Sequence, residues 1–177
     1  FDSVEYCNKL SAKEGLKPYY ELTVLKRSGP AINEAEVKIL KGNGYHIPTD
    51  AEWEHGCRAG SKTQYHFGDK DDDLGEYAWY NQNSENRTHG VGEKKPNAFG
   101  LYDMHGNVWE WAEDSDKLPS RLLRGGSFFN QASAVRSAPR TWLVPSNRNN
   151  TTGFRPSRTL QLVPLTPLQS SPEGGGK

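Results

Sequence analysis

The stretch Asn97-Ala-Phe-Gly-Leu-Tyr-Asp-Met-His-Gly-Asn-Val-Trp-Glu-Trp111 decides the fold of this chain. It combines four aromatic side chains, a Gly-Asn pair and two acids in one short segment. Aromatic rings bury large apolar areas, and Gly106-Asn107 tolerates the positive φ angles of a tight turn. Asp103 and Glu110 flank this turn, and calcium binds oxygen ligands. The segment is therefore expected to act as core and as a metal-binding loop.

The composition of the chain is that of a single loop-rich domain. Its 177 residues include 33% hydrophobic residues, 18 Gly and 11 Pro, so the core must rely on aromatic residues. Lys plus Arg equals Asp plus Glu at 22 each, so no net charge attracts nucleic acid or an anionic membrane. No apolar run approaches the roughly 20 residues of a membrane span. Neither nucleic acid nor a membrane is an expected partner.

The N-terminal part of the chain predicts a helix followed by a hairpin. The helix is expected from Asp2 to about Glu14, and Gly15 is well placed to end it. Strands are expected over Tyr19–Val24 and Val37–Leu40, around a polar turn at Ser28-Gly29-Pro30.

A second helix is expected to start at Thr49. The Thr49 hydroxyl can accept a backbone N–H, and Glu52 can reach back, which together make a capping box. Trp53 would pack inward, and the helix would end near Gly60. In the polar segment that follows, Tyr77–Tyr80 is expected to form a core-facing turn or short helix.

The C-terminal part predicts further short strands. Arg121–Phe129 is expected to be a strand with an irregularity at Gly125-Gly126. Thr159–Val163 is expected to be the last strand, and Pro164–Lys177 a disordered tail. Two helices with short strands and many loops indicate the α+β class.

Four blocks, taken in order, resemble the formylglycine-generating enzyme family, also called the sulfatase-modifying factor family. They are Gly44 to Gly60, Asn97 to Trp111, Leu123 to Ser127, and Gly153 to Arg155. The resemblance extends from Phe1 to about Leu160.

The resemblance implies a specific architecture. It is the irregular C-type-lectin-like fold, with two main helices, short antiparallel strands and many loops. The domain would comprise residues 1–160, with the end of the last strand and the tail in residues 161–177. Family members carry an additional N-terminal strand region, so this chain is expected to be a fragment or a processed piece. An upstream domain of a longer polypeptide is then a candidate partner.

Two cysteines, Cys7 and Cys57, each lie in an expected helix among apolar neighbours. A disulfide and two free buried thiols both remain open, and free thiols are favoured. In extracellular relatives the equivalent cysteines pair with partners near the C-terminus. Pro156 follows Gly-Phe-Arg where such a partner would stand. With no disulfide framework visible, the sequence favours a bacterial cytoplasmic setting.

The resemblance also implies a calcium site. Its ligands would be the side chains of Asp103 and Glu110 and the backbone carbonyls of Gly106 and Val108. Calcium takes six to eight oxygen ligands, which such a loop can largely supply. The alternative is that Asp103 caps the Gly-Asn turn and Glu110 pairs with an arginine such as Arg124. The resemblance favours structural calcium.

Copper chemistry is not expected from this chain. In formylglycine-generating enzymes, a cysteine pair shortly after Arg-Gly-Gly-Ser binds copper through thiolates. The corresponding stretch, Arg124 to Arg136, contains no cysteine, and none follows Cys57 anywhere. The five histidines show no zinc-type spacing. We therefore assign no catalytic residues.

Five of the arginines in the C-terminal half are candidates for a specific role, and they divide into two groups. Arg124 and Arg155 are expected to be internal struts paired with Glu52, Glu54 or Glu110, because a fold with few apolar residues needs satisfied polar bridges inside.

The other arginines suggest an exposed ligand face. Guanidinium groups present planar forks of donors to a carboxylate or phosphate, and an aromatic residue beside them adds flat contact surface. The candidate ligand-binding residues are Arg136, Arg140, Trp142, Asn147 and Arg148.

Three functional hypotheses follow. The first is a formylglycine-generating-enzyme-like domain without the copper-binding cysteines, which acts as a binding or accessory module for a peptide or small molecule. The second is a sulfatase-modifying oxidoreductase, or a sulfoxide-synthase-type enzyme, that acts on sulfur substrates with a missing partner domain. The third is a domain that only stabilises a larger polypeptide.

Overall fold

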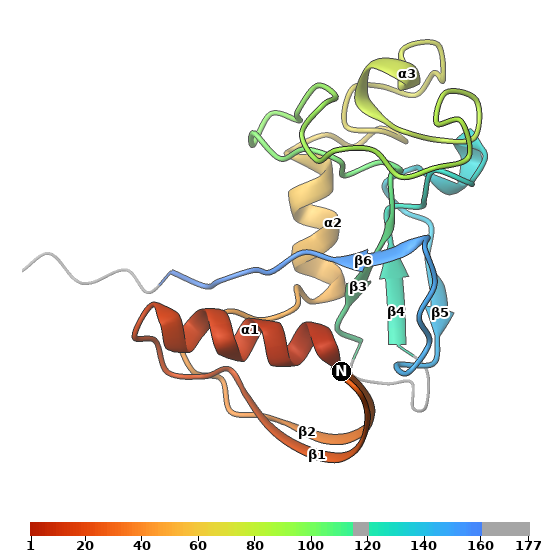
Figure 1. Ribbon diagram of the computed structural model, residues 1–177. Helices are drawn as coiled ribbons and strands as arrows, with labels where there is room; N and C mark the ends of the chain where they lie inside the picture. Colours follow the sequence, from red (N-terminus) through yellow and green to blue (C-terminus); the bar gives the residue numbers. More distant parts are fainter. Residues whose placement is uncertain (115–120, 161–177) are drawn as a thin grey trace, which may run out of the picture.

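The computed structural model describes residues 1–114 and 121–160, and it has the expected α+β class. Figure 1 shows the order of the elements along the chain. They are α1 (Asp2–Lys13), β1 (Tyr20–Ser28), β2 (Ala31–Ile39), α2 (Asp50–Arg58), α3 (Leu74–Tyr77), β3 (Trp109–Ala112), β4 (Arg121–Arg124), the 3-10 turn η1 (Ala132–Ala134), β5 (Thr141–Leu143) and β6 (Thr152–Phe154). No helix within these described ranges is long and apolar enough to cross a bilayer.

The first helix and the hairpin form where the sequence predicted them. Val4 and Cys7 are the buried apolar residues of α1, and Gly15 follows its end with φ +68°. The strands β1 and β2 pair antiparallel and extend much further toward the turn than Val24 and Val37, the expected limits. The expectation was too short because most residues near the turn are polar or exposed, apart from the buried Ile32. They lack hydrophobic alternation, yet their backbones still pair.

The second helix confirms its local signals. The Thr49 hydroxyl accepts the N–H of Glu52 at 3.2 Å, and the Glu52 carboxylate accepts the N–H of Thr49 at 2.9 Å. Trp53 is 2% exposed, as predicted. The helix ends at Arg58, and the left-handed residue that stops it is Ala59, with φ +47°.

Two boundaries differ from the sequence-based expectation. The strand expected over Arg121–Phe129 ends at Arg124, because Gly125 and Gly126 have φ angles of +91° and +75° and turn the chain away from the ladder. The short helix near Tyr77 lies earlier than expected, as α3, and the chain after it buries Ala78 and Tyr80.

The C-terminal strand was also misplaced. The last strand in the described part of the chain is β6, whereas Thr159 and Leu160 lie in irregular structure. The remainder of that expected strand and the tail Pro164–Lys177 lie outside the described residues.

A four-stranded sheet brings distant motifs together. Its order is β5-β4-β3-β6, with β3 antiparallel to β4, β4 antiparallel to β5, and β3 parallel to β6. Glu110 in β3 therefore lies opposite Arg124 in β4 on one side and Gly153 in β6 on the other. The sheet thus unites three of the sequence blocks that carried the resemblance.

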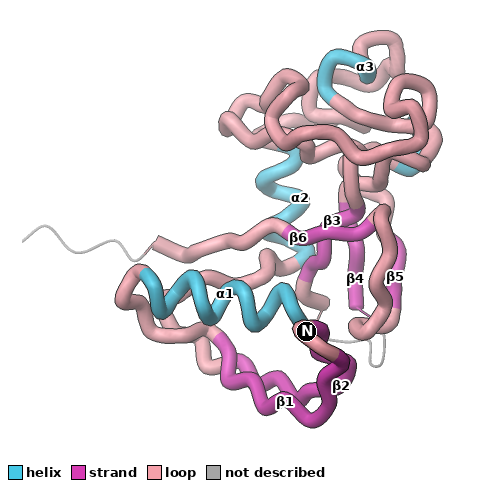
Figure 2. The backbone as a smooth tube through the Cα atoms, viewed as in Figure 1, coloured by secondary structure: helices cyan, strands magenta, loops and turns pink. Residues whose placement is uncertain are grey.

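Helices and loops surround this sheet in distinct regions. Figure 2 shows α1 beside the β1–β2 hairpin, and a large set of loops at the opposite end of the molecule, around α3. The described residues form three separate small hydrophobic cores. Val4, Cys7, Tyr20 and Ile47 form one, Trp53, Cys57 and Met104 the second, and Tyr65, Leu74, Ala78, Tyr80 and Val135 the third.

Candidate functional site

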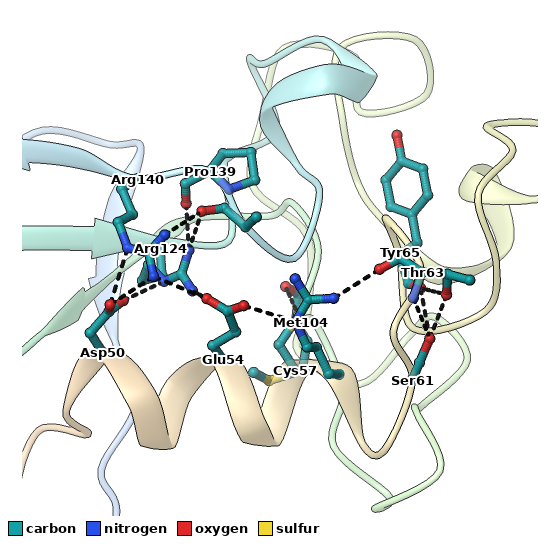
Figure 3. Close-up of polar contacts among 12 residues, drawn as sticks. Asp50, Glu54, Cys57, Ser61, Thr63, Tyr65, Met104, Arg124, Pro139 and Arg140 are labelled. Atoms are coloured by element: carbon teal, nitrogen blue, oxygen red, sulfur yellow. Dashed lines mark hydrogen bonds and ion pairs between the residues drawn. The ribbon is translucent and has the colours of Figure 1, made fainter.

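A buried arginine at the end of β4 organises the contact between α2 and β5. Arg124 is 0% exposed, and its Nη1 donates to the carbonyls of Ala138 at 2.6 Å and Pro139 at 2.8 Å (Figure 3). Its Nη2 donates to Glu54, and its Nε lies 2.9 Å from Asp50 Oδ1 as an ion pair without linear hydrogen-bond geometry. Burial lowers the pKa of Arg124, although both acids oppose that effect. Arg124 is therefore an internal strut, as the sequence predicted.

The candidate ligand residue Arg140 belongs to the same network. Its Nε and Nη2 donate to Asp50 Oδ2 at 3.1 and 2.8 Å, and Nη2 also donates to Glu54 Oε2 at 3.1 Å. The hydrogen bond with Asp50 raises the pKa of Arg140. Its side chain is still 39% exposed. Arg140 thus combines a fixed orientation with an accessible surface.

Glu110 pairs with an arginine, but the partner is Arg155 and not Arg124. Arg155 donates to Glu110 through Nε at 2.9 Å and Nη2 at 2.7 Å, which is a bidentate pair. The indole N–H of Trp53 donates to the same carboxylate at 2.8 Å. Arg124 lies over the Trp53 ring, 5.0 Å from its centroid. Trp53 therefore stands between Arg124 and Glu110, and this separates two residues that face each other across the sheet.

The loop before β3 is tightly constrained. Asp103 and Asn107 have φ angles of +57° and +59°, and Gly106 has φ +75°. A Cβ on Gly106 would lie 2.1 Å from the carbonyl oxygen of Trp79, so only glycine fits there. Asp103 Oδ2 accepts the N–H of Gly92 at 2.8 Å, which differs from the turn cap that we expected as the alternative to calcium.

The same loop has features that suit a cation. The other oxygen of Asp103, Oδ1, is buried and has no hydrogen-bond partner among the described residues. The lining of a pocket of about 420 Å³ includes the four residues of the expected calcium site, Asp103, Gly106, Val108 and Glu110, and also Arg155, which pairs with Glu110. The described residues contain no cluster of three or more His, Cys, Asp or Glu side chains that could hold a metal. A site here would consequently depend on backbone carbonyls as well as two carboxylates, which is usual for calcium.

The other candidate ligand residues are distributed over several segments. Trp142 lies in the edge strand β5 and is 36% exposed, and Asn147 lies in an exposed turn. Arg148 donates to Asp2 Oδ2 at 2.8 Å and to the carbonyl of Ile32 at 2.8 Å. Arg140 and Arg148 are thus anchored on different elements, α2 and the start of α1.

Arg136 follows the buried Val135, and its Nε is buried without a hydrogen-bond partner among the described residues.

Sequence reasoning missed the acids that hold these exposed arginines. Asp50 is 90 residues from Arg140, and Asp2 is 146 residues from Arg148. No local spacing rule connects residues so far apart, so the only available signal was the excess of acids in the first turns of α1 and α2.

Both cysteine thiols are free and buried, as favoured from the sequence. Cys7 lies in α1 and Cys57 in α2, within different core clusters. Burial raises the pKa of each thiol to about 12, so both remain protonated near neutral pH.

The segment that begins at Ser127, after Arg124-Gly-Gly, forms a tight local turn. The backbone N–H and the hydroxyl of Ser127 donate to Asn130 Oδ1 at 2.9 and 2.7 Å, and Val135 is 0% exposed. The chemistry of this turn is that of hydroxyl and amide groups, without a thiol.

Comparisons with known proteins agree with the motif blocks. A family model described as the sulfatase-modifying factor enzyme 1-like domain matches residues 1–160. The chaperone protein LppX of Paenibacillus barcinonensis is 33% identical, over 92% of this chain and 66% of LppX. The inactive C-alpha-formylglycine-generating enzyme 2 of Bos taurus is 33% identical, over 63% of this chain and 43% of that protein.

A solved structure has the same fold. Treponema denticola variable protein 1 superimposes with a TM-score of 0.74 at 30% identity, over 86% of this chain and 66% of that one. This chain therefore spans at most about two thirds of each of these relatives.

Proposed function

The chain belongs to the sulfatase-modifying factor enzyme 1-like family, and from this premise we propose that it is a binding or accessory module without copper oxidase activity. The observation that carries the proposal is the state of its sulfur groups. Copper(I) favours soft sulfur ligands, and the copper site of formylglycine-generating enzymes uses a pair of thiolates. The two thiols of this chain are buried, protonated and located on separate helices.

The names of two relatives support a role of this kind. One is called a chaperone protein and another an inactive formylglycine-generating enzyme. A fold that is kept while catalysis is lost would serve its partner through binding.

We place the proposed ligand contact on the exposed face of the C-terminal half. Its residues are Arg136, Arg140, Trp142, Asn147 and Arg148. The orientation of Arg140 by Asp50 and Glu54 supports this placement, because a guanidinium that is already ordered loses less entropy on binding. The proposed ligand is a peptide or a small molecule.

We also propose that the loop from Asp103 to Glu110 holds a structural calcium ion. Asp103 and Glu110 would bind it through carboxylate oxygens, and Gly106 and Val108 through carbonyls. The unpaired Asp103 Oδ1 in the lining of the pocket supports this assignment. A bound calcium ion would supply positive charge that neutralises the loop and fixes its backbone.

The absence of oxidase activity is tested by incubating the chain with copper, a reductant, oxygen and a cysteine-containing sulfatase peptide. We expect no conversion of the peptide thiol to an aldehyde, as measured by mass spectrometry. An active formylglycine-generating enzyme, assayed in parallel, is the positive control. Aldehyde formation by this chain alone would refute the proposal and would favour the sulfatase-modifying oxidoreductase.

A further inference from the structure

A second pocket, remote from the calcium loop, lies where α1, the β1–β2 hairpin, the start of α2 and the end of β3 meet. Its volume is about 590 Å³, within the usual range for small-molecule sites. The walls are largely apolar, formed by Val4, Val37, Ile39, Ile47, Trp111 and Pro145. Val37 and Ile39 are 38% and 48% exposed, so this apolar wall is open to solvent.

One carboxylate is fixed in the wall of this pocket. Glu113 directly follows β3, and its backbone N–H donates to the carbonyl of Pro48 at 2.8 Å. The hydroxyl of Tyr20 donates to Glu113 Oε1 and accepts the N–H of Ile47 at 2.9 Å. These contacts hold the Glu113 side chain in one orientation.

The second oxygen of this carboxylate remains available. No hydrogen bond from a described residue to Glu113 Oε2 is observed, and the residue as a whole is partly exposed. Burial raises the pKa of Glu113, which shows that its charge is poorly solvated where it stands. A positive group brought to Oε2 would replace the lost solvation.

The other charged side chains of the pocket are of both signs. Asp50 and Asp114 line it together with Glu113, whereas Arg121 is the one basic side chain among the described lining residues. Asp50 is already paired with Arg124 and Arg140. Glu113 is therefore the acid best placed to receive a ligand.

We propose that this pocket binds a small apolar molecule that carries a protonated amine. The amine would contact Glu113 Oε2, and the apolar body would pack against Trp111, Ile47 and Ile39. The charged hydrogen bond to Glu113 would orient the ligand, and the surrounding apolar wall would add affinity. This site lies apart from the proposed calcium loop, and it shares Asp50 with the network that orients Arg140.

The test uses three probes with the same apolar body and different charge. The full chain is titrated with 3-phenylpropylamine, 3-phenylpropanol and 3-phenylpropionate, and binding is followed by calorimetry and tryptophan fluorescence. We expect the amine to bind at least about tenfold more tightly than the alcohol, and the carboxylate to bind most weakly.

Variants locate the binding. Glu113→Gln keeps the acceptor for Tyr20 and removes the charge, so the preference for the amine over the alcohol should fall to less than about twofold. Ile39→Ser changes an exposed strand residue and should weaken the binding of the amine and of the alcohol. Glu36→Gln, an exposed acid on β2 outside the pocket, is the matched control and should bind as the natural chain does.

Three results would each overturn the inference. They are the absence of saturable binding of the amine, equal binding of the three probes, and an unchanged preference for the amine in Glu113→Gln. None of them affects the proposal of a non-catalytic module, which depends on the copper and peptide assay.

Discussion

Two arginines, the buried Arg124 and the partly exposed Arg155, serve neighbouring regions of this molecule in different ways. Arg124 joins α2 to the loop before β5, and its guanidinium contacts two carboxylates and two carbonyls. Arg155 neutralises Glu110 in the loop region, yet it leaves a buried oxygen of Asp103 without a partner. The network around Arg124 is therefore a closed structural network, in which each acid has a cationic partner. The loop around Asp103 still has a carboxylate oxygen that could bind a cation.

The largest expected effect comes from removing the closed network. Arg124→Ala would leave a cavity beside Asp50 and Glu54 and would remove the buried cation that pairs with both acids. Breaking a buried ion pair costs about 3–5 kcal/mol. The free energy of unfolding should fall by that amount in urea denaturation. Arg87→Ala, which removes an exposed arginine paired with Glu85, is the control and should change little. Equal losses in the two variants would show that the network is not structural.

Acid should destabilise the two regions differently, with an effect of about 4 kcal/mol at pH 5. His105, from the loop block, stacks on His66 with ring centroids 5.0 Å apart. Burial lowers the pKa of His66 to about 4 and that of His105 to about 3, well below the ordinary 6.5. Between pH 6.5 and about 4, the unfolded chain binds these protons and the folded chain does not. The stability is therefore present above pH 6.5 and falls by about 1.4 kcal/mol per pH unit for each histidine.

The Arg124 network should persist through this pH range. Burial alone would raise the pKa of Glu54, but Arg58 and Arg124 outweigh it and lower the pKa below its usual value. Hydrogen exchange at pH 5 should thus show the region around His105 opening before the contact between α2 and β4. His66→Gln should flatten the pH dependence, whereas His55→Gln, at an exposed position of α2, should not. Simultaneous opening of both regions would contradict this order.

How much of this comparison could be predicted from the sequence depends on the range of each interaction. The capping box of α2 and the burial of Trp53 were predicted because their signals are local. Both arginines were correctly expected to be struts, since buried charges need partners. Glu54 and Glu110 were among the three acids expected to pair with them, but the sequence did not tell which acid pairs with which arginine.

The pairing of Glu110 with Arg155 instead of Arg124 has a physical reason. Glu110 faces Arg124 across the β3–β4 ladder, so pairing them was a reasonable expectation. Trp53 enters from α2 and donates to Glu110 while its ring lies under Arg124. A contribution from a third element cannot be read from the spacing of the other two. For the same reason, no sequence pattern indicated the pocket at Glu113.

Calcium addition and removal test whether the loop from Asp103 to Glu110 binds a cation. If the ion binds, a concentration of about 100 times its Kd adds about 2.7 kcal/mol, and a chelator should lower the Tm by several degrees. Asp103→Asn should abolish the response to the chelator, because it replaces the charged carboxylate whose Oδ1 has no partner. Asp69→Asn, in an exposed loop, should retain the response. An unchanged Tm in chelator would show that Arg155 alone satisfies this loop.

The smallest effect is expected at the exposed edge of the closed network. Arg140 shares Asp50 and Glu54 with Arg124, but its side chain is 39% exposed, so solvent screens its ion pairs. Arg140→Ala should therefore lower the free energy of unfolding by less than about 1 kcal/mol in urea denaturation. A loss as large as that of Arg124→Ala would make Arg140 a second strut, since its acids would then depend on it for charge balance. A small loss leaves Arg140 free to exchange one of its two acids for an anionic group of a ligand without unfolding the domain.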